Sequence, residues 1–171
     1  TFSDFQFYDI LSQKLPENIN LHFSNSSPIR YAQLFDFQKN NIYCNRGTSG
    51  IDGCTSTAMG FAMKDSKQTV LVTGELSFFY DINGLWNNYI PPYTRIIVVN
   101  NGGGDIFKII PGPDSTNALD EFILTKHHKN AELLAKHFGF SYTKVEEEDS
   151  LSRVLDNFFK PDAKPKILEV D

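Results

Sequence analysis

Two apolar runs constrain the fold of this chain more than any other feature. Val70-Leu71-Val72 and Ile96-Ile97-Val98-Val99 contain no polar residue. Strands of this kind are buried on both faces, which is typical of parallel sheets covered by helices on either side. Strand-like and helix-like segments alternate along the rest of the chain, as in doubly wound domains. The sequence therefore predicts an α/β fold with three layers, in which a mainly parallel six-stranded sheet lies between helices on both faces.

The spacing of apolar residues gives the expected elements. Strands are expected over residues 20–25, 41–45, 69–73, 94–99, 141–145 and 166–170. Helices are expected over residues 1–15, 28–35, 54–63, 78–88, 130–138 and 150–159. Residues 105–119 form a long irregular stretch that contains two prolines. The chain has 171 residues, of which 40% are hydrophobic, and this composition fits a single domain over residues 1–171.

Charge and composition exclude several classes of function. The net charge of −5 argues against a nucleic-acid partner, and no apolar run approaches the roughly 18 residues of a membrane span. Cys44 and Cys54 match no zinc spacing and are expected to be small buried residues in a reducing cytosol. The chain begins with neither Met nor a secretory signal. We expect a cytoplasmic protein, with this chain as an internal piece of a longer one.

A carboxylate and an amide follow the two apolar runs. Gly74-Glu75-Leu76-Ser77 comes after the first run, and Asn100-Asn101-Gly102-Gly103-Gly104 comes after the second. One helix and one return strand fit between them, so Glu75 and Asn101 are expected side by side at the carboxyl edge of the sheet. Ligands bind at that edge in open α/β sheets. Hard oxygen donors beside a glycine-rich backbone suit a divalent cation that carries a diphosphate.

Each of these residues has a simpler interpretation when taken alone. Glu75 could be an acid that favours the helix dipole, and Asn100-Asn101 could be a turn. Their occurrence together at two strand ends favours the metal–phosphate site. The chain contains no G-x-x-x-x-G-K-[ST] loop, and Phe107 stands where the last glycine of G-x-G-x-x-G would be.

Other polar and aromatic residues are expected to be structural or solvated. His127 and His128 lie in a polar stretch and are predicted to be solvated rather than catalytic. Residues 146–149 are all acidic and are predicted to be a solvated face that leads into a helix. Phe78, Phe79 and Trp86 are predicted to lie in the core.

The two strand-end segments resemble the thiamin-diphosphate motif, a Gly-Asp-Gly start closed by Asn-Asn some 25–30 residues later. More specifically, nearly the whole chain resembles the C-terminal domain of the 2-succinyl-5-enolpyruvyl-6-hydroxy-3-cyclohexene-1-carboxylate synthases, the MenD family of menaquinone biosynthesis. The segments that carry this resemblance are residues 24–30, 45–53, 74–85 and 98–107. Residues 45–53 and 102–107 separate this family from other thiamin-diphosphate enzymes.

The resemblance implies a function. A transferase of this family uses thiamin diphosphate and Mg²⁺ (or Mn²⁺) to decarboxylate 2-oxoglutarate and add the succinyl-semialdehyde carbanion to isochorismate. The cofactor lies between this domain and an N-terminal pyrimidine-binding domain, across the subunit interface of a homodimer or tetramer. The glutamate that activates the cofactor belongs to that N-terminal domain, so no catalytic residue is certain on this chain. The resemblance implies that the chain alone is inactive.

The resemblance also implies roles for individual residues. Those implied for the metal are Glu75, Asn101 and Gly103. Those implied for the cofactor are Gly50, Ile51, Gly74, Leu76, Ser77, Asn101, Gly103, Gly104 and Asp105. Those implied for the substrates are Ser26, Arg30, Arg46, Ile106, Phe107 and Ile110. The arginines suit substrates that are both dianions, because guanidinium groups pair with carboxylates bidentately.

The chain departs from the family's motif at one residue, and two other functions are alternatives to this hypothesis. The family's usual metal-binding Asp is Glu75 here, so one extra methylene must be absorbed by the loop or by a shifted ion. A 2-oxoacid decarboxylase or an acetolactate-synthase-like enzyme would use the same cofactor, although small neutral acyl groups need no pair such as Arg30 and Arg46. A non-catalytic α/β module that binds a nucleotide or a protein partner would use none of this chemistry.

Overall fold

A sheet of six parallel strands forms the centre of the computed structural model, which describes residues 3–171 and, at residue 114, the backbone alone. The strand order is β2-β1-β3-β4-β6-β5. The strands are β1 (Asn20–Phe23), β2 (Asn41–Cys44), β3 (Thr69–Gly74), β4 (Thr94–Val99), β5 (Ser141–Val145) and β6 (Lys166–Val170). The α-helices are α1 (Asp4–Lys14), α2 (Ser27–Ala32), α3 (Cys54–Ala62), α4 (Glu75–Tyr80), α5 (Glu132–His137) and α6 (Glu148–Phe158).

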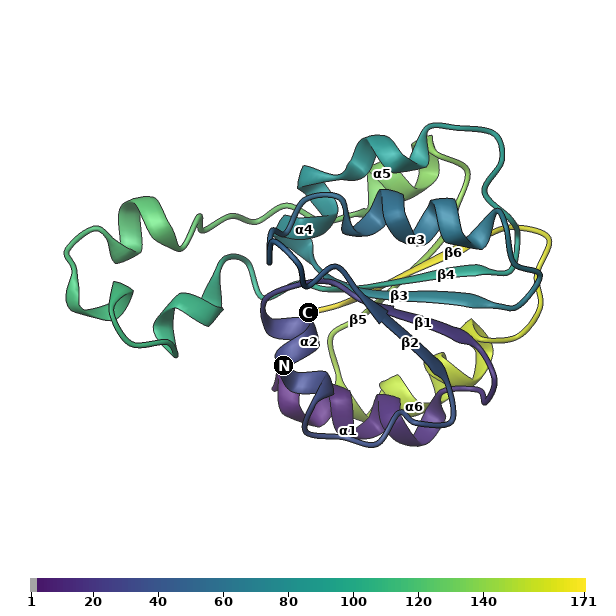
Figure 1. The fold of residues 1–171 in the computed structure, drawn as a ribbon, viewed down its shortest axis with the longest axis horizontal. Coiled ribbons are helices and arrows are strands. Elements are labelled where there is room, and N and C mark those ends of the chain that lie inside the picture. The colour runs from purple at the N-terminus through teal and green to yellow at the C-terminus, as the bar shows by residue number, and fades with distance from the viewer. Residues whose placement is uncertain (1–2) are drawn as a thin grey trace.

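Helices cover both faces of the sheet (Figure 1). Helices α1, α2 and α6 lie on one face, and α3, α4 and α5 lie on the other. The chain moves outward from β1 to β2, returns to β3 on the other side of β1, and continues to β4. Right-handed crossovers in these two directions require helices on opposite faces. The predicted three-layer fold is therefore confirmed.

Two hydrophobic clusters fill the space between the sheet and its helices. Val70, Val72 and Ile97 belong to the cluster beneath α1 and α6, whereas Leu71 and Ile96 belong to the cluster beneath α3 and α5. Successive side chains of a strand point to opposite faces, so the unbroken apolar runs feed both clusters. This is the physical reason why β3 and β4 contain no polar residue at those positions.

The expected strands and most of the expected helices are found within a few residues of their predicted bounds. The first two residues of the helix predicted over 1–15 lie outside the described part of the chain. The helix predicted over 78–88 is different: α4 begins at Glu75, ends at Tyr80 and is followed by a 3-10 turn over Ile82–Leu85. Asp81 marks the break, and its carboxylate accepts hydrogen bonds from the backbone N–H and the hydroxyl of Ser56 in α3.

The segment between β4 and α5 projects from the carboxyl edge of the sheet as an arm (Figure 1). We use "the arm" for residues 105–123, which contain two 3-10 turns and a π-helical turn over Leu119–Ile123. Ile109 and Phe122, both on the arm, are 66% and 72% exposed. Among residues 3–171, no helix has the length and apolarity needed to cross a membrane.

Three predictions about single residues can be judged from burial. Phe78 is fully buried, and Phe79 packs against the same cluster. Trp86 is 75% exposed, so its predicted place in the core is wrong. The prediction treated Trp86 as part of a continuous helix, but the break at Asp81 removes it from the buried face. The acidic residues 146–149 are exposed, as predicted.

Candidate functional site

A cavity of about 320 Å³ opens at the carboxyl ends of β1, β3 and β4. It lies where the chain leaves β1 toward one face of the sheet and β3 toward the other, which is where open α/β sheets bind ligands. Twelve of the predicted site residues line it. They are Ser26, Ile51, Gly74, Glu75, Leu76, Ser77, Asn101, Gly103, Gly104, Asp105, Ile106 and Phe107.

Glu75 is buried at the first position of α4, with 3% of its side chain exposed. Gly74 pairs with Val99 in the sheet, and this register sets Glu75 beside the segment that follows β4. Burial raises the pKa of the Glu75 carboxyl to about 7, although the N–H groups of Glu75, Gly103 and Leu76 act in the opposite direction. Glu75 Oε1 has no hydrogen-bond partner among the described residues. A buried carboxylate oxygen without a partner is costly and is the atom that a cation would satisfy.

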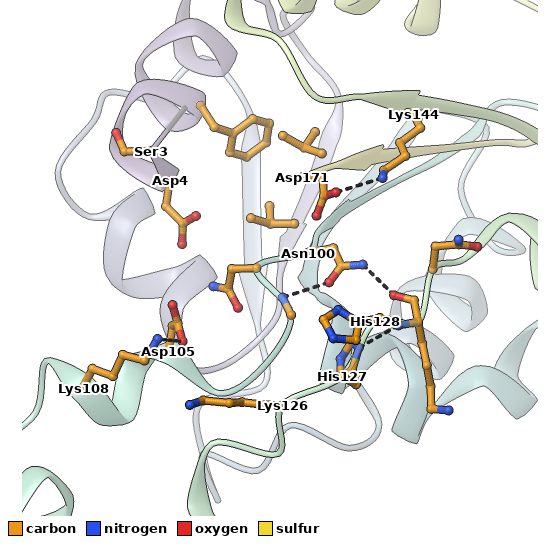
Figure 2. Close-up of a pocket in the computed structure, with 17 residues that line it drawn as sticks. Ser3, Asp4, Asn100, Asp105, Lys108, Lys126, His127, His128, Lys144 and Asp171 are labelled. Atoms are coloured by element: carbon orange, nitrogen blue, oxygen red, sulfur yellow. Dashed lines mark hydrogen bonds and ion pairs between the residues drawn. The ribbon is translucent and has the colours of Figure 1, made fainter. Parts of the chain in front are cut away.

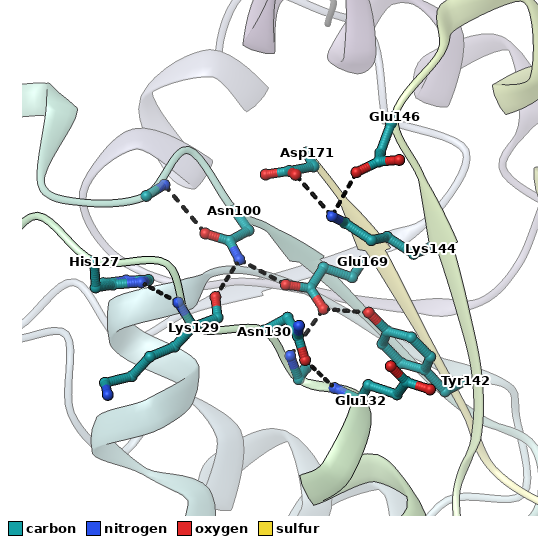
Figure 3. A network of polar contacts seen from close by, with 12 residues as sticks. Asn100, His127, Lys129, Asn130, Glu132, Tyr142, Lys144, Glu146, Glu169 and Asp171 are labelled. Atoms are coloured by element: carbon teal, nitrogen blue, oxygen red, sulfur yellow. Dashed lines mark hydrogen bonds and ion pairs between the residues drawn. The ribbon is translucent and has the colours of Figure 1, made fainter.

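The two asparagines after β4 have different roles. Asn100 is buried, and its amide nitrogen donates to the carboxylate of Glu169 (2.6 Å) and to the carbonyl of Lys129 (2.9 Å; Figure 3). Its Oδ1 accepts from the N–H of Gly102 at 3.1 Å. Asn100 is thus occupied in holding the loop, whereas Asn101 lines the cavity.

A second acid lies at the cavity beside Asn101. It is Asp4, in the first turn of α1, and the polar side chain of Asn101 lowers the pKa of its carboxyl. Burial and the negative charge of Asp105 outweigh it, so the pKa of Asp4 is raised overall. The Asn101 side chain carries both an amide nitrogen and an amide oxygen, and the oxygen is the kind of atom that a hard cation takes as a ligand.

Glu169 anchors the loop from below. Its two carboxylate oxygens accept from Asn100, from the N–H of Ala131 (2.8 Å) and from the hydroxyl of Tyr142 (2.6 Å; Figure 3). Burial and the bond to Glu169 raise the pKa of the Tyr142 hydroxyl. Four elements (β4, β5, β6 and the start of α5) therefore meet at one fully buried carboxylate.

The loops after β1 and β2 complete the wall of the cavity. The amide nitrogen of Asn25, which is buried, donates to the carbonyls of Asn45 and Gly50. The hydroxyl of Ser77 donates to the carbonyl of Ile51 and ties that loop to α4. Ser26 has a φ of +73°, a conformation that costs a non-glycine residue about 1–3 kcal/mol and is concentrated at functional sites.

The glycines at 103 and 104 are needed for packing against the arm and the segment that follows it. A Cβ added to Gly103 would lie 2.6 Å from the carbonyl oxygen of Leu124, and one added to Gly104 would lie 3.0 Å from the Phe107 ring. The N–H of Gly104 also donates to that Leu124 carbonyl at 2.6 Å. The close contact at Gly103 is therefore with the chain that returns from the arm.

Four of the predicted residues do not line the cavity. Gly50 directly precedes Ile51, and its carbonyl is held by Asn25. Arg30 is exposed on α2, and Ile110 is half-buried on the arm. Arg46 is exposed, and its Nη1 donates to Asn25 Oδ1 at 3.4 Å.

A second cavity of about 730 Å³ is lined in part by residues 100–102 (Figure 2). Three lysines on its wall are paired with acids: Lys108 with Asp105, Lys126 with Asp120, and Lys144 with both Glu146 and Asp171. Because three of its four lysines are paired and Asp4 also lines it, the cavity is not strongly basic.

His127 is not the solvated side chain that the sequence predicted. Only 10% of its side chain is exposed, and its Nε2 lies 3.5 Å from Glu75 Oε1. Burial, and then the nearby Lys129, lower the pKa of the His127 imidazole. The prediction for the neighbouring His128 is correct, since it is exposed. The polar sequence around both histidines gave no indication that one of them faces the site.

The atoms that the smaller cavity offers to a metal are oxygens. Within residues 3–171 no group of three or more His, Cys, Asp and Glu side chains is arranged to hold a metal. A cation beside Glu75 would depend on the Asn101 amide and on backbone carbonyls, the mixed oxygen ligands typical of Mg²⁺ and Ca²⁺. Asp4, Asn25 and Glu169 also shape the site and were not singled out from the sequence. Asn25 lies two residues beyond β1, whereas Asp4 lies in the first turn of α1 and Glu169 lies within β6, so the positions of these two acids gave no signal.

A protein-family model described as "Thiamine pyrophosphate enzyme, C-terminal TPP binding domain" matches residues 26–170. The chain is 46% identical over 170 residues to the 2-succinyl-5-enolpyruvyl-6-hydroxy-3-cyclohexene-1-carboxylate synthase of Christiangramia forsetii, covering 99% of this chain and 30% of that protein. It is 50% identical over 155 residues to the enzyme of the same name from Flavobacterium psychrophilum, covering 90% of this chain and 28% of that protein.

Solved structures show the same fold. The benzoylformate decarboxylase of Polynucleobacter necessarius superposes with a TM-score of 0.80 at 17% identity, over 99% of this chain and 33% of that one. The thiamine diphosphate-dependent 4-hydroxybenzoylformate decarboxylase of Rhodococcus jostii gives a TM-score of 0.77 at 21% identity, over 97% of this chain and 32% of that one. The chain spans about 30% of the length of its curated relatives.

Proposed function

Because the chain belongs to the family of C-terminal TPP-binding domains of thiamine pyrophosphate enzymes, we propose that it serves as that domain in a 2-succinyl-5-enolpyruvyl-6-hydroxy-3-cyclohexene-1-carboxylate synthase. The similarity to relatives of that name extends over nearly the whole chain. The enzyme would join 2-oxoglutarate, after its decarboxylation, to isochorismate in menaquinone biosynthesis. The remaining domains, including a pyrimidine-binding domain, and a homodimeric or tetrameric cytoplasmic assembly are part of this proposal.

The buried, unpartnered oxygen of Glu75 is the observation that carries the proposal. It lies in the same cavity as Asn101 and Gly103. A Mg²⁺ ion would be held by the Glu75 carboxylate, the Asn101 amide oxygen and the Gly103 carbonyl. These are hard oxygen donors, and Mg²⁺ commonly adds phosphate oxygens and water to such a set. The diphosphate would lie against the backbone of Gly74, Leu76, Ser77, Gly104 and Asp105.

The chain's own residues would position the cofactor and the substrates. The hydroxyl of Ser77 donates to the Ile51 carbonyl and so fixes an apolar side chain at the cavity wall, where it would contact the cofactor. When bound, thiamin diphosphate supplies the carbon nucleophile and the electron sink. Ile106 and Phe107 would exclude water from the reacting carbons, while Ser26, Arg30 and Arg46 would pair with substrate carboxylates.

Two substitutions of Glu75 in the full-length enzyme test the proposal. Glu75→Ala should remove activity that depends on both thiamin diphosphate and Mg²⁺, because the metal loses its only charged protein ligand. Glu75→Asp should retain much of that activity, since it restores the usual ligand of the family. Activity is measured as CO₂ release from 2-oxoglutarate with isochorismate present. Unchanged activity in Glu75→Ala would refute the assignment of Glu75 as a metal ligand.

The choice of substrate requires a separate experiment. Arg46→Ala should raise the concentration of 2-oxoglutarate or isochorismate needed for half-maximal rate, because a carboxylate loses its partner. If the carboxylate is left buried and unpaired, the cost is of order 2–5 kcal/mol.

Two other experiments test the alternatives. Faster turnover of pyruvate than of 2-oxoglutarate by the full-length enzyme would favour an acetolactate-synthase-like activity. Binding of ADP or NAD without thiamin diphosphate, measured by calorimetry, would favour a nucleotide-binding module.

A further inference from the structure

The imidazole of His127 faces the carboxylate of Glu75 from the loop that returns from the arm. Their Nε2 and Oε1 atoms are 3.5 Å apart, and 10% and 3% of the two side chains are exposed. Neither atom has a hydrogen-bond partner in the part of the chain that the structure describes. The separation is about half an ångström longer than a strong hydrogen bond. Two buried polar atoms without partners therefore point at one another.

Two contacts fix the position of His127. Its backbone N–H donates to the carbonyl of Gly102 at 3.0 Å, and Gly102 has a φ of +75° that other residues rarely adopt. The ring packs edge-on against Phe79 of α4, with centroids 5.8 Å apart. Figure 2 shows His127 beside the Asn100 loop, with His128 next to it. The imidazole is therefore attached both to the loop after β4 and to the helix that begins at Glu75.

The remaining ring nitrogen defines which tautomer is present. The backbone N–H of Lys129 donates to His127 Nδ1 at 3.1 Å (Figure 3). Nδ1 is then an acceptor, so the hydrogen of the neutral ring is on Nε2, the atom that faces Glu75. A nitrogen that carries this hydrogen cannot also coordinate a metal. His127 can thus donate to the carboxylate but is not itself a ligand.

We propose that His127 is a positioning residue for the metal site, whose Nε2–H holds the carboxylate of Glu75 in the orientation that binds the cation. The proposal rests on the proposed function, in which Glu75 is a metal ligand. It also accounts for the extra methylene of Glu75 relative to the usual Asp. The longer side chain brings its carboxylate within reach of His127, and this contact restrains the added rotation.

A purely structural role for His127 is the competing explanation, because the residue also joins the loop to α4. The length of the acidic side chain at position 75 distinguishes the two explanations. If His127 acts through Glu75, its removal should matter little when residue 75 is Asp, whose shorter side chain cannot reach it. If His127 only supports the loop, its removal should have the same effect whichever acid is present.

The test is a double-mutant cycle on the full-length enzyme, with Mn²⁺ affinity in the presence of thiamin diphosphate measured by electron paramagnetic resonance. His127→Phe keeps the ring and its contact with Phe79 but removes the donor. Removing such partners of a ligand typically lowers metal affinity by about 10- to 100-fold, and we expect a loss in this range. His127→Gln, which retains an N–H near the Nε2 position, should recover most of the affinity. His128→Phe is the matched exposed control and should change nothing.

In the Glu75→Asp background, His127→Phe should change Mn²⁺ affinity by less than about 2-fold. An equal loss in both backgrounds, or no loss in either, would overturn the proposal. A Mn²⁺ site that Glu75→Ala leaves intact would instead refute the proposed function itself, which separates the two failures. Thermal unfolding of every variant checks its fold, and His127→Gln keeps the test decisive if His127→Phe unfolds.

Discussion

Glu75 favours the binding of a ligand but lowers the stability of the protein when no ligand is bound. Its carboxyl is buried, its Oε1 lacks a partner among the described residues, and burial raises its pKa to about 7. A carboxyl whose pKa is higher in the folded state favours folding when protonated, so stability falls as the pH rises from about 4.5 through about 7. Glu75 therefore lowers the free energy of unfolding of the protein without a cation, and a bound cation would restore it.

We expect Glu75→Gln to stabilise the metal-free protein at pH 8 by about 1–3 kcal/mol, because it removes a buried charge at similar size. The gain should shrink toward pH 5, where Glu75 is protonated in the folded state. The measurement is the free energy of urea unfolding at both pH values in the presence of a chelator. A variant that is less stable than the parent at pH 8 would contradict this account.

Gly103 tests whether the backbone at the site is constrained by Leu124, the residue that follows the arm. Gly103→Ala should destabilise the protein by about 1–3 kcal/mol, because its Cβ would lie 2.6 Å from the Leu124 carbonyl oxygen. Gly60→Ala is the matched control: this exposed position in α3 has no atom within 4 Å of an added Cβ. The control should gain about 0.5–1 kcal/mol from helix propensity. Equal effects of the two substitutions on urea unfolding would contradict the close contact.

At the scale of elements, the carboxyl edge of the sheet is held together by buried polar groups. Glu169 of β6 joins β4, β5 and the start of α5, and Asn25 joins the loops that follow β1 and β2. Arg95 has a similar role at the opposite end of the sheet. Its fully buried side chain donates to the carbonyls of Phe158 and Lys160 at 2.7 Å. At the carboxyl edge, these buried polar groups lie beside the site cavity.

Glu169→Gln should lower the free energy of unfolding by about 2–3 kcal/mol, because hydrogen bonds to a buried charged group are strong and the new amide would face the Asn100 amide nitrogen. Urea unfolding measures this. Asp156→Asn is the control, since Asp156 pairs with Lys14 on the surface and its side chain is 54% exposed; its effect should be within about 0.5 kcal/mol. An equally small change for Glu169→Gln would show that the network is not structural.

The elements themselves were largely predictable from the sequence, because apolar periodicity decides burial. The bounds of β4, β5 and β6 are those predicted, and Glu75 and Asn101 meet as the βαβ spacing requires. The end of α4 was not predictable, since it depends on the hydrogen bonds that Ser56, in another helix, donates to Asp81. The position of His127 was not predictable either, because it follows from how the arm returns to Gly102.

At the scale of the whole molecule, the site lies at an open edge from which the arm projects. Ile109, Phe122 and Trp86 are large apolar side chains exposed on this chain, and the chain spans about 30% of the length of its curated relatives. Under the proposed function, other domains would cover such surfaces and supply the remaining half of the site.

The isolated chain is accordingly expected to have no measurable 2-oxoglutarate decarboxylation and to bind thiamin diphosphate more weakly than the full-length enzyme. Calorimetry with thiamin diphosphate and Mg²⁺, carried out on both proteins, measures the difference. A robust rate of decarboxylation by residues 1–171 alone would show that the cavity at the sheet edge is a complete active site.

The most direct test of the central claim is a crystal structure of the full-length enzyme grown with thiamin diphosphate and Mn²⁺, in which anomalous scattering locates the metal. The account predicts one anomalous peak at coordination distance from the Glu75 carboxylate, the Asn101 amide oxygen and the Gly103 carbonyl, with diphosphate oxygens beside it. A bound cofactor whose metal lies elsewhere, with Glu75 still without a partner, would contradict it.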